Sequence, residues 1–335
     1  MKSKLLCGIP FEETRSPEPA GPPLAWAFSA DRQEKKAWRQ FWLQDPIMGG
    51  LNYVTHHALR LLPVSGCSRF GAMLAPFARK RFSRSNFSIR IGNNMATLAP
   101  NAASSEQGTD ALVARWWENI GRVFAEFSVT DRHWDAGLVK ISGQEHFHAL
   151  QRRGKQVIFV SAHLGHWEAQ MSILSKALGI TLTGPFQPEP SRFTNRLVHN
   201  LRKRRRQFFF PPGQKSAIRL HRLLKSQSAH ALIYVDDVRD GQIHLPLFER
   251  PVPDRGNAVA AIKLAKSTNS ALLPVYIYRT SAANYQMTIL PEIEIQQREN
   301  QDIAIKETIK QINDSLEPAV LEHIDQWYML AELRR

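Results

Sequence analysis

Short apolar segments that alternate with helical patterns constrain the fold of this chain more than any other feature. The apolar segments span 157–160, 180–183, 231–235, 271–278 and 285–290. Helical patterns near 167–178, 215–226 and 257–268 lie between several of them. Strands that alternate with helices favour an α/β fold. We therefore expect a mainly parallel central sheet flanked by helices.

The chain ahead of this alternation is predicted to form an N-terminal helical region. Apolar faces within 47–82 are interrupted by His56, Arg60 and Pro63, so no run of about 18 apolar residues exists to span a membrane. Two interfacial or buried helices fit this segment. Further helical patterns span 31–44, 108–128 and 302–323.

The expected domain organisation follows from these patterns. Residues 1–45 form a proline-rich, loose leader with a short helix, and residues 46–135 form the helical, membrane-proximal region. Residues 136–335 form the α/β core, which we expect to pack with the helical region as one domain.

The charge of the chain limits the classes of partner that it can bind. Lys and Arg number 44 against 30 Asp and Glu, which gives a net charge of +14. This excess predicts an anionic partner: a membrane surface, an acidic or phosphorylated substrate, or nucleic acid. Two cysteines are too few for a disulfide framework and fit a reducing compartment.

A basic run, Arg202–Arg206, is followed by Phe208-Phe209-Phe210. Basic residues beside aromatic rings are typical of a membrane interface, and they would also fit an acidic carrier protein or nucleic acid. No nucleic-acid-reading motif accompanies the run, so nucleic acid is not an expected partner. A solvated surface is the alternative interpretation.

The stretch HLGHWE at 163–168 carries reactive groups at one strand-to-helix junction. If His163 lies in the turn and Glu168 in the first turn of the helix, the two side chains can meet, since Gly165 gives the backbone freedom. The carboxylate would fix the tautomer of the imidazole and stabilise the imidazolium. His163 is therefore a candidate base for activating a hydroxyl. A capped helix with an ordinary surface histidine is the alternative.

Asp236 and Asp237 follow the strand predicted at 231–235. Carboxylates at the end of a parallel strand reach the same edge of the sheet as His163. They lack a third ligand at a recognisable spacing, so we expect no metal site there. A structural role, such as capping a loop or pairing with Arg239, is the alternative to substrate binding.

A series of segments in fixed order carries a family resemblance. It runs HLGHWE, a proline-containing segment, a strand ending in Asp236-Asp237, HLPLF, a helix of small residues and ALLPVYIYR. In this order, over about residues 50–330, the chain resembles the bacterial late lipid A acyltransferases, the lauroyl and myristoyl transferases of the glycerolipid acyltransferase superfamily. Gly143–His146 and Arg81–Asn86 resemble that family's flanking segments.

The resemblance implies a mechanism and a set of site residues. His163 would be the general base on an acceptor hydroxyl, with Glu168 orienting it, and the hydroxyl would attack the thioester of acyl carrier protein or acyl-CoA. No cofactor, metal or covalent enzyme intermediate is implied. Backbone N–H groups at the helix start, or Arg279, would bind the oxyanion. The residues implied in substrate binding are Asp236, Asp237, Gln187, Arg279, Arg202, Arg204 and Arg205.

Departures from the family pattern concern the acceptor. Gln187 stands where the family has a substrate-binding arginine, Asp237 replaces a glutamine, and the aromatic and basic ending is reduced to residues 327–331. A lipid A precursor is the expected acceptor. A glycolipid, a lysophospholipid or a specialised metabolite stays open, as does a non-catalytic relative that binds membranes or a carrier. The expected location is the cytoplasmic face of the bacterial inner membrane, peripheral or monotopic, on an anionic surface.

Overall fold

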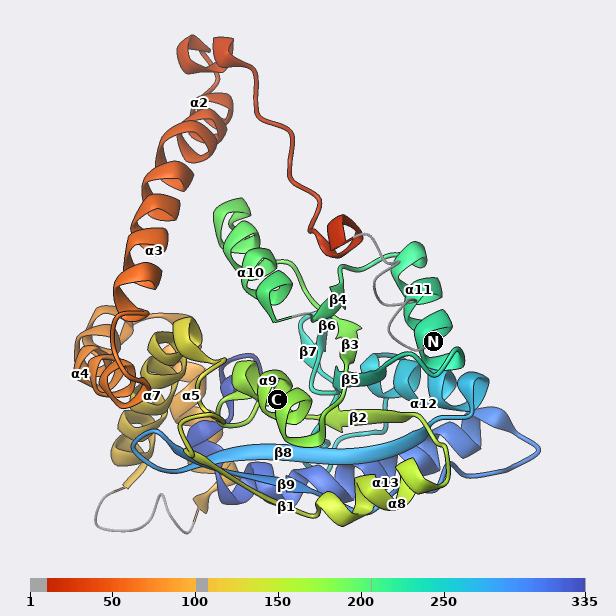
Figure 1. The fold of residues 1–335 in the computed structure, drawn as a ribbon. Coiled ribbons are helices and arrows are strands. Elements are labelled where there is room, and N and C mark those ends of the chain that lie inside the picture. The colour runs from red at the N-terminus through yellow and green to blue at the C-terminus, as the bar shows by residue number, and fades with distance from the viewer. Residues whose placement is uncertain (1–10, 101–107, 206, 335) are drawn as a thin grey trace.

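The computed structural model describes residues 11–100, 108–205 and 207–334, and a seven-stranded sheet forms its centre (Figure 1). The strand order is β1-β9-β8-β2-β5-β3-β4. The strands are β1 (Val139–Ser142), β2 (Val157–Ser161), β3 (Leu182–Pro185), β4 (Phe208–Phe210), β5 (His230–Tyr234), β8 (Ala271–Ser281) and β9 (Asn284–Ile289). A separate ribbon pairs β6 (Val238–Arg239) with β7 (Gln242–Ile243).

The sheet is parallel except at one hairpin, which confirms the expected mainly parallel sheet. Strands β8 and β9 pair antiparallel, whereas β2 pairs parallel with both β8 and β5. Strand β2 is buried on both faces: Val157 to Val160 are all 0% exposed. Phe159 faces one hydrophobic cluster, and Ile158 and Val160 face another. This alternation is what a strand with a side-chain period of two residues gives between two layers.

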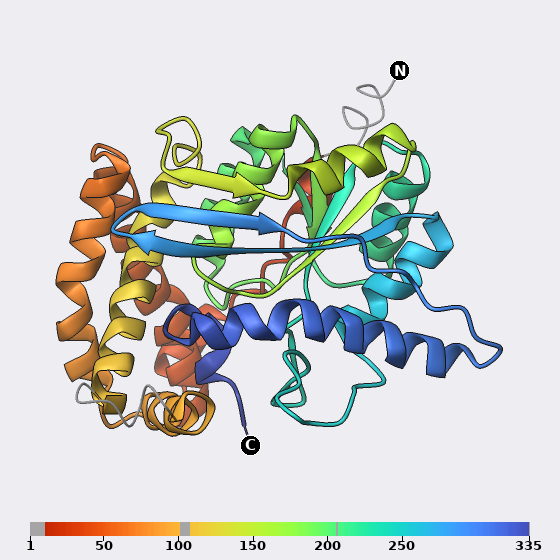
Figure 2. The ribbon, with the colours of Figure 1, turned by 90° about the horizontal axis from the view of Figure 1, so that it is seen from below.

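Helices cover both faces of the sheet (Figure 2). Helices α8 (Gln144–Arg152) and α9 (Trp167–Leu178) contribute to the cluster around Phe159. Helices α11 (Gln214–Lys225), α12 (Asn257–Thr268) and α13 (Gln301–Glu322) contribute to the cluster around Ile158. The predicted helices at 167–178 and 257–268 have the observed bounds, and those at 215–226 and 302–323 are displaced by one residue.

The N-terminal helices gather at one end of the sheet (Figure 1). They are α3 (Asp45–Leu59), α4 (Val64–Phe82), α5 (Asn86–Leu98) and α7 (Gly108–Glu126). Helices α4 and α7 touch at Gly71 and Gly121, where a Cβ on Gly71 would lie 2.2 Å from the Gly121 carbonyl oxygen. The two helices expected within 47–82 are thus confirmed as α3 and α4. None of the helices in the described residues is both long and apolar enough to cross a membrane.

The leader was expected to be loose, but its described part is tied to the core. It comprises η1 (Phe11–Thr14), η2 (Leu24–Phe28), α2 (Arg32–Arg39) and η3 (Gln40–Gln44). Glu13 forms a two-bond ion pair with Arg219 of α11, and Glu18 forms one with Arg196 of α10 (Arg192–Arg204). These two ion pairs connect the leader to α10 and α11.

Candidate active site

His163 lies in the turn between β2 and α9, as the sequence predicts. The turn is tight because Gly165 adopts a positive φ of 55°, and a Cβ there would lie 2.5 Å from the Ile277 carbonyl oxygen. Only glycine accepts both the backbone conformation and the close approach without strain. The turn therefore sits directly against β8, at the carboxyl edge of the sheet.

Asp236 holds His163 by two contacts from the end of β5. Its Oδ1 lies 2.7 Å from the imidazole Nδ1, and its Oδ2 accepts a 2.7 Å hydrogen bond from the His163 backbone N–H. Asp236 is 0% exposed, while the His163 side chain is 24% exposed. The buried carboxylate thus fixes the tautomer with the proton on Nδ1. Nε2 is the nitrogen left to accept a proton from a substrate.

The end of the chain completes this arrangement. The indole Nε1 of Trp327 donates a 3.0 Å hydrogen bond to Asp236 Oδ2, and the Tyr328 backbone N–H donates to the His163 carbonyl oxygen at 2.9 Å. Gly165 N–H also donates to the Gln326 carbonyl oxygen. These residues lie in η5 (Ile324–Gln326), in η6 (Tyr328–Ala331) and between them. The ending that the sequence suggested was reduced therefore forms part of the site.

The pKa of His163 follows from this environment. Burial lowers it, but the charge and hydrogen bond of Asp236 outweigh burial, with additional help from the charges of Glu168 and Asp237. The net result is a pKa above the ordinary histidine value. A raised pKa makes the imidazole a stronger proton acceptor, and the buried carboxylate stabilises the imidazolium that results.

Glu168 lies in the first turn of α9, but its expected hydrogen bond to the imidazole is made by Asp236 instead. The physical reason is the orientation of the His163 ring, which stacks on Tyr234 of β5 at 4.3 Å between centroids and so faces β5. Glu168 acts on His163 through its charge alone in this structure. Its charge also acts on Tyr234 and Arg202.

Arg202 brings a positive charge into the same surroundings. Its guanidinium lies 4.4 Å from the ring centroid of Phe186 and 5.4 Å from that of Phe209. Burial lowers the pKa of Arg202, and the charges of Glu168, Glu189 and Tyr234 oppose that shift. The basic run is therefore not a solvated face at this position. Phe209 and Phe210 are also buried, in the edge strand β4, and do not form a membrane interface.

Other expected substrate-binding residues have structural partners. Arg205 donates a 3.2 Å hydrogen bond to Asp131. Asp237 accepts a hydrogen bond from the Asn257 backbone N–H at the start of α12 and forms an ion pair with Arg239. These contacts are the structural role that the sequence offers as the alternative to substrate binding.

Arg279, one of the two expected oxyanion donors, is bound to a carboxylate instead. Its guanidinium is 5% exposed and pairs with Glu126 at 2.7 Å, in a buried cluster. Gln187 is exposed after β3. The Arg204 side chain and Arg206 lie outside the described residues.

Three residues of the site were missed from the sequence. Trp327 binds Asp236, Tyr234 stacks on His163, and Tyr328 stacks on Trp167 with centroids 4.6 Å apart. Tyr234 had a signal, because it is the last residue of β5 and comes two residues before Asp236. Trp327 and Tyr328 stood out only as part of a reduced ending, because they contact site residues that lie at least 91 positions earlier in the chain.

Comparisons with known proteins give a family match over most of the chain. Residues 47–335 match the family model described as bacterial lipid A biosynthesis acyltransferase. No curated protein matches the chain. Among solved structures, the chain is similar to the 1-acyl-sn-glycerophosphate acyltransferase PlsC from Thermotoga maritima, at 13% identity and a TM-score of 0.36. That match covers 75% of this chain and 96% of the other.

Proposed function

Because this chain belongs to the bacterial lipid A biosynthesis acyltransferase family, we propose that it moves a fatty acyl group from an acyl thioester to a hydroxyl of a lipid A precursor, with His163 as the general base. An acyltransferase that acts on a lipid-like acceptor is what the family establishes. The observation that carries the finer proposal is the Asp236–His163 pair. It fixes the imidazole with Nε2 free on the partly exposed side.

The reaction proceeds by direct transfer. Nε2 of His163 takes the proton of the acceptor hydroxyl as its oxygen attacks the thioester carbonyl carbon, forming the new ester C–O bond. The C–S bond then breaks, and the imidazolium returns the proton to the departing sulfur, which leaves as the thiol and restores the neutral imidazole. Asp236 stabilises that imidazolium from inside, where the low dielectric strengthens the interaction.

Backbone N–H groups at the start of α9 are the proposed oxyanion donors. The first N–H groups of a helix have no partner within it, and the helix dipole favours negative charge there. The Arg279 guanidinium is bound to Glu126, so it is not the donor we propose.

Arg202 and Glu168 flank the proposed acceptor position. Arg202 carries the positive charge that suits a phosphorylated glycolipid headgroup. Glu168 supports the charge of the imidazolium and balances Arg202. The net charge of +14 suits both an anionic acceptor and the acidic carrier protein that we propose as donor, with acyl-CoA as the other thioester of this class.

We also propose a location on the cytoplasmic face of the inner membrane, and an exposed apolar surface supports the lipid contact that this location requires. Helices α3 and α4 expose large apolar side chains that include Ile47, Met48, Leu51, Val54, Met73, Leu74 and Phe77, and Leu61 is exposed in the turn between them. On α3, Ile47, Leu51 and Val54 have the four- and three-residue spacing of one helical face. A continuous exposed apolar face beside basic side chains is typical of proteins that bind a lipid surface.

The proposed function is tested by lipid mass spectrometry of bacteria that express the wild-type chain or His163→Ala. We expect a lipid A species heavier by one acyl chain only with the wild type, since general-base catalysis contributes about 10²–10⁴-fold. His148→Ala, on α8, is the matched control and should behave as the wild type. An acylated glycolipid, phospholipid or other metabolite in place of lipid A would correct the acceptor.

The rate of product formation by His163→Ala can also contradict the mechanism. If His163→Ala accumulates the acylated product at the wild-type rate, His163 is not the base. If neither chain yields a product, hydrolysis or transfer of purified acyl carrier protein thioesters separates a missing acceptor from a non-catalytic relative.

A further inference from the structure

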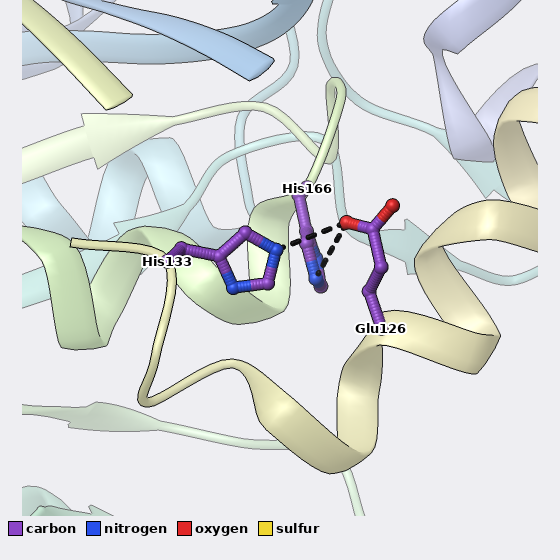
Figure 3. Close-up of side chains that lie close together, drawn as sticks. All are labelled: Glu126, His133 and His166. Carbon is purple, nitrogen blue, oxygen red and sulfur yellow. Dashed lines mark hydrogen bonds and ion pairs between the residues drawn. The ribbon is translucent and has the colours of Figure 1, made fainter. Parts of the chain in front are cut away.

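A second polar cluster is buried beside the catalytic turn, and the proposed mechanism does not use it. Glu126 ends α7, His133 follows η4 (Phe127–Val129), and His166 lies in the turn before α9. All three are 0% exposed. Figure 3 shows the two imidazole rings meeting at one carboxylate oxygen.

The distances among these groups suit a metal ion. Oε2 of Glu126 lies 3.0 Å from His133 Nε2 and 3.7 Å from His166 Nε2, and the candidate ligand atoms all lie within 4.8 Å of one another. In a tetrahedral zinc site with bond lengths of about 2.0–2.1 Å, ligand atoms stand about 3.3 Å apart. The two measured separations bracket that value.

His166 has no hydrogen bond that explains its burial. Neither its Nδ1 nor its Nε2 has a hydrogen-bond partner among the described residues, and His133 Nδ1 has none either. Burying an imidazole with both nitrogens unpaired costs free energy, because the group loses its hydrogen bonds to water. A metal ion bound to His166 would compensate for part of this cost.

The surrounding residues hold the carboxylate in the orientation that a metal requires. Arg279 binds Oε1 of Glu126 at 2.7 Å, which leaves Oε2 directed at the two histidines. The Tyr285 hydroxyl donates to Oε2 at 2.6 Å and so also orients this oxygen. Outer hydrogen bonds of this kind orient metal-ligating carboxylates.

We propose that Glu126, His133 and His166 bind a divalent transition metal of the zinc class. The ligand set of two imidazoles and one carboxylate favours zinc over magnesium or calcium. Because His166 is three residues beyond His163, the ion would pin the catalytic turn to the end of α7. The proposed role of the metal ion is structural, and this proposal does not depend on the proposed acyl-transfer mechanism.

The test is a metal titration of the untagged full-length chain. Bound metal is removed from the protein with a chelator, and the protein is then dialysed against zinc chloride. Its zinc content is measured by inductively coupled plasma mass spectrometry. We expect one zinc per chain and a higher melting temperature after zinc is added. Cobalt(II) in the same site should give the intense visible absorption of tetrahedral coordination.

Variants assign the site to these residues. His166→Gln and His133→Gln should each weaken zinc binding by about tenfold or more, whereas His148→Gln, outside the cluster, should leave it unchanged. The wild-type titration needs no variant to fold. The proposal is overturned if the wild-type chain takes up no zinc or cobalt and its melting temperature does not change. It is also overturned if folded His166→Gln binds zinc as the wild type does.

Discussion

At the scale of single residues, the site depends on which carboxylate contacts His163. The sequence offered Glu168, because it is five residues away within one motif. The structure places Asp236 on Nδ1, since the parallel pairing of β2 with β5 brings the two strand ends together. Local spacing could not decide between the two, because the orientation of the imidazole ring is set by Tyr234 on the neighbouring strand.

Substitutions of the two carboxylates should separate their roles. Asp236→Asn removes the charge that stabilises the imidazolium, so we expect turnover to fall by about 10² or more. Glu168→Gln removes a charge that is not hydrogen-bonded to His163, so we expect a smaller loss, by about tenfold. The measurement is the steady-state rate of thiol release from an acyl thioester in the presence of acceptor.

The reverse ranking would correct the assignment. If Glu168→Gln abolished turnover while folded Asp236→Asn kept it, Glu168 would be the partner of His163 in the working complex. Circular dichroism of both variants serves as the control for folding, because Asp236 also accepts the Trp327 indole N–H.

At the scale of elements, periodic helices and a fully apolar strand were predictable, whereas the shortest strands were not. The helices α9 and α12 follow from apolar periodicity and from glycine or asparagine at the helix ends, and the strand β2 follows from a continuous apolar run. The strands β1 and β4 are four and three residues long, too short for a periodic signal. Whether Phe208–Phe210 pairs with β3 or meets a membrane is decided by partners distant in sequence.

The C-terminal segment shows the same limit at the site itself. Its short 3-10 turns have no apolar period, yet the helical region fixes them: the indole of Trp116 donates to the Trp327 carbonyl oxygen, and the amide of Asn94 donates to those of Leu330 and Leu333. Helices α5 and α7 therefore position the C-terminal segment, whose Trp327 in turn donates a hydrogen bond to Asp236. The division of the chain into a leader, a helical region and a core stays a prediction.

At the scale of the whole molecule, an exposed apolar surface over α3 and α4 accompanies a large positive charge. Leu51 and Val54 are 56% and 65% exposed on α3. Replacing both with Glu should lower binding to vesicles of phosphatidylglycerol and phosphatidylethanolamine by about tenfold or more, since burying one such side chain is worth about 1.5–3 kcal/mol. Co-sedimentation measures the bound fraction.

A substitution of a distant exposed apolar residue controls for the introduction of a glutamate. Ile218 is 45% exposed on α11, away from α3 (Figure 1), and Ile218→Glu should leave vesicle binding unchanged. Equal binding by the wild type and the Leu51→Glu, Val54→Glu variant would mean that α3 does not meet the lipid.

The dependence of kcat/KM on pH tests most directly whether His163, held by Asp236, is the base. The base must be unprotonated, and its pKa in the folded chain is raised, so the wild-type rate should increase with pH through an apparent pKa above the ordinary histidine value of about 6.5. In Asp236→Asn, the carboxylate charge that raises the pKa of His163 is lost, whereas burial still lowers it. The apparent pKa of the rate should therefore move down. A wild-type rate without this rise, or a rise unchanged in Asp236→Asn, would contradict the assignment.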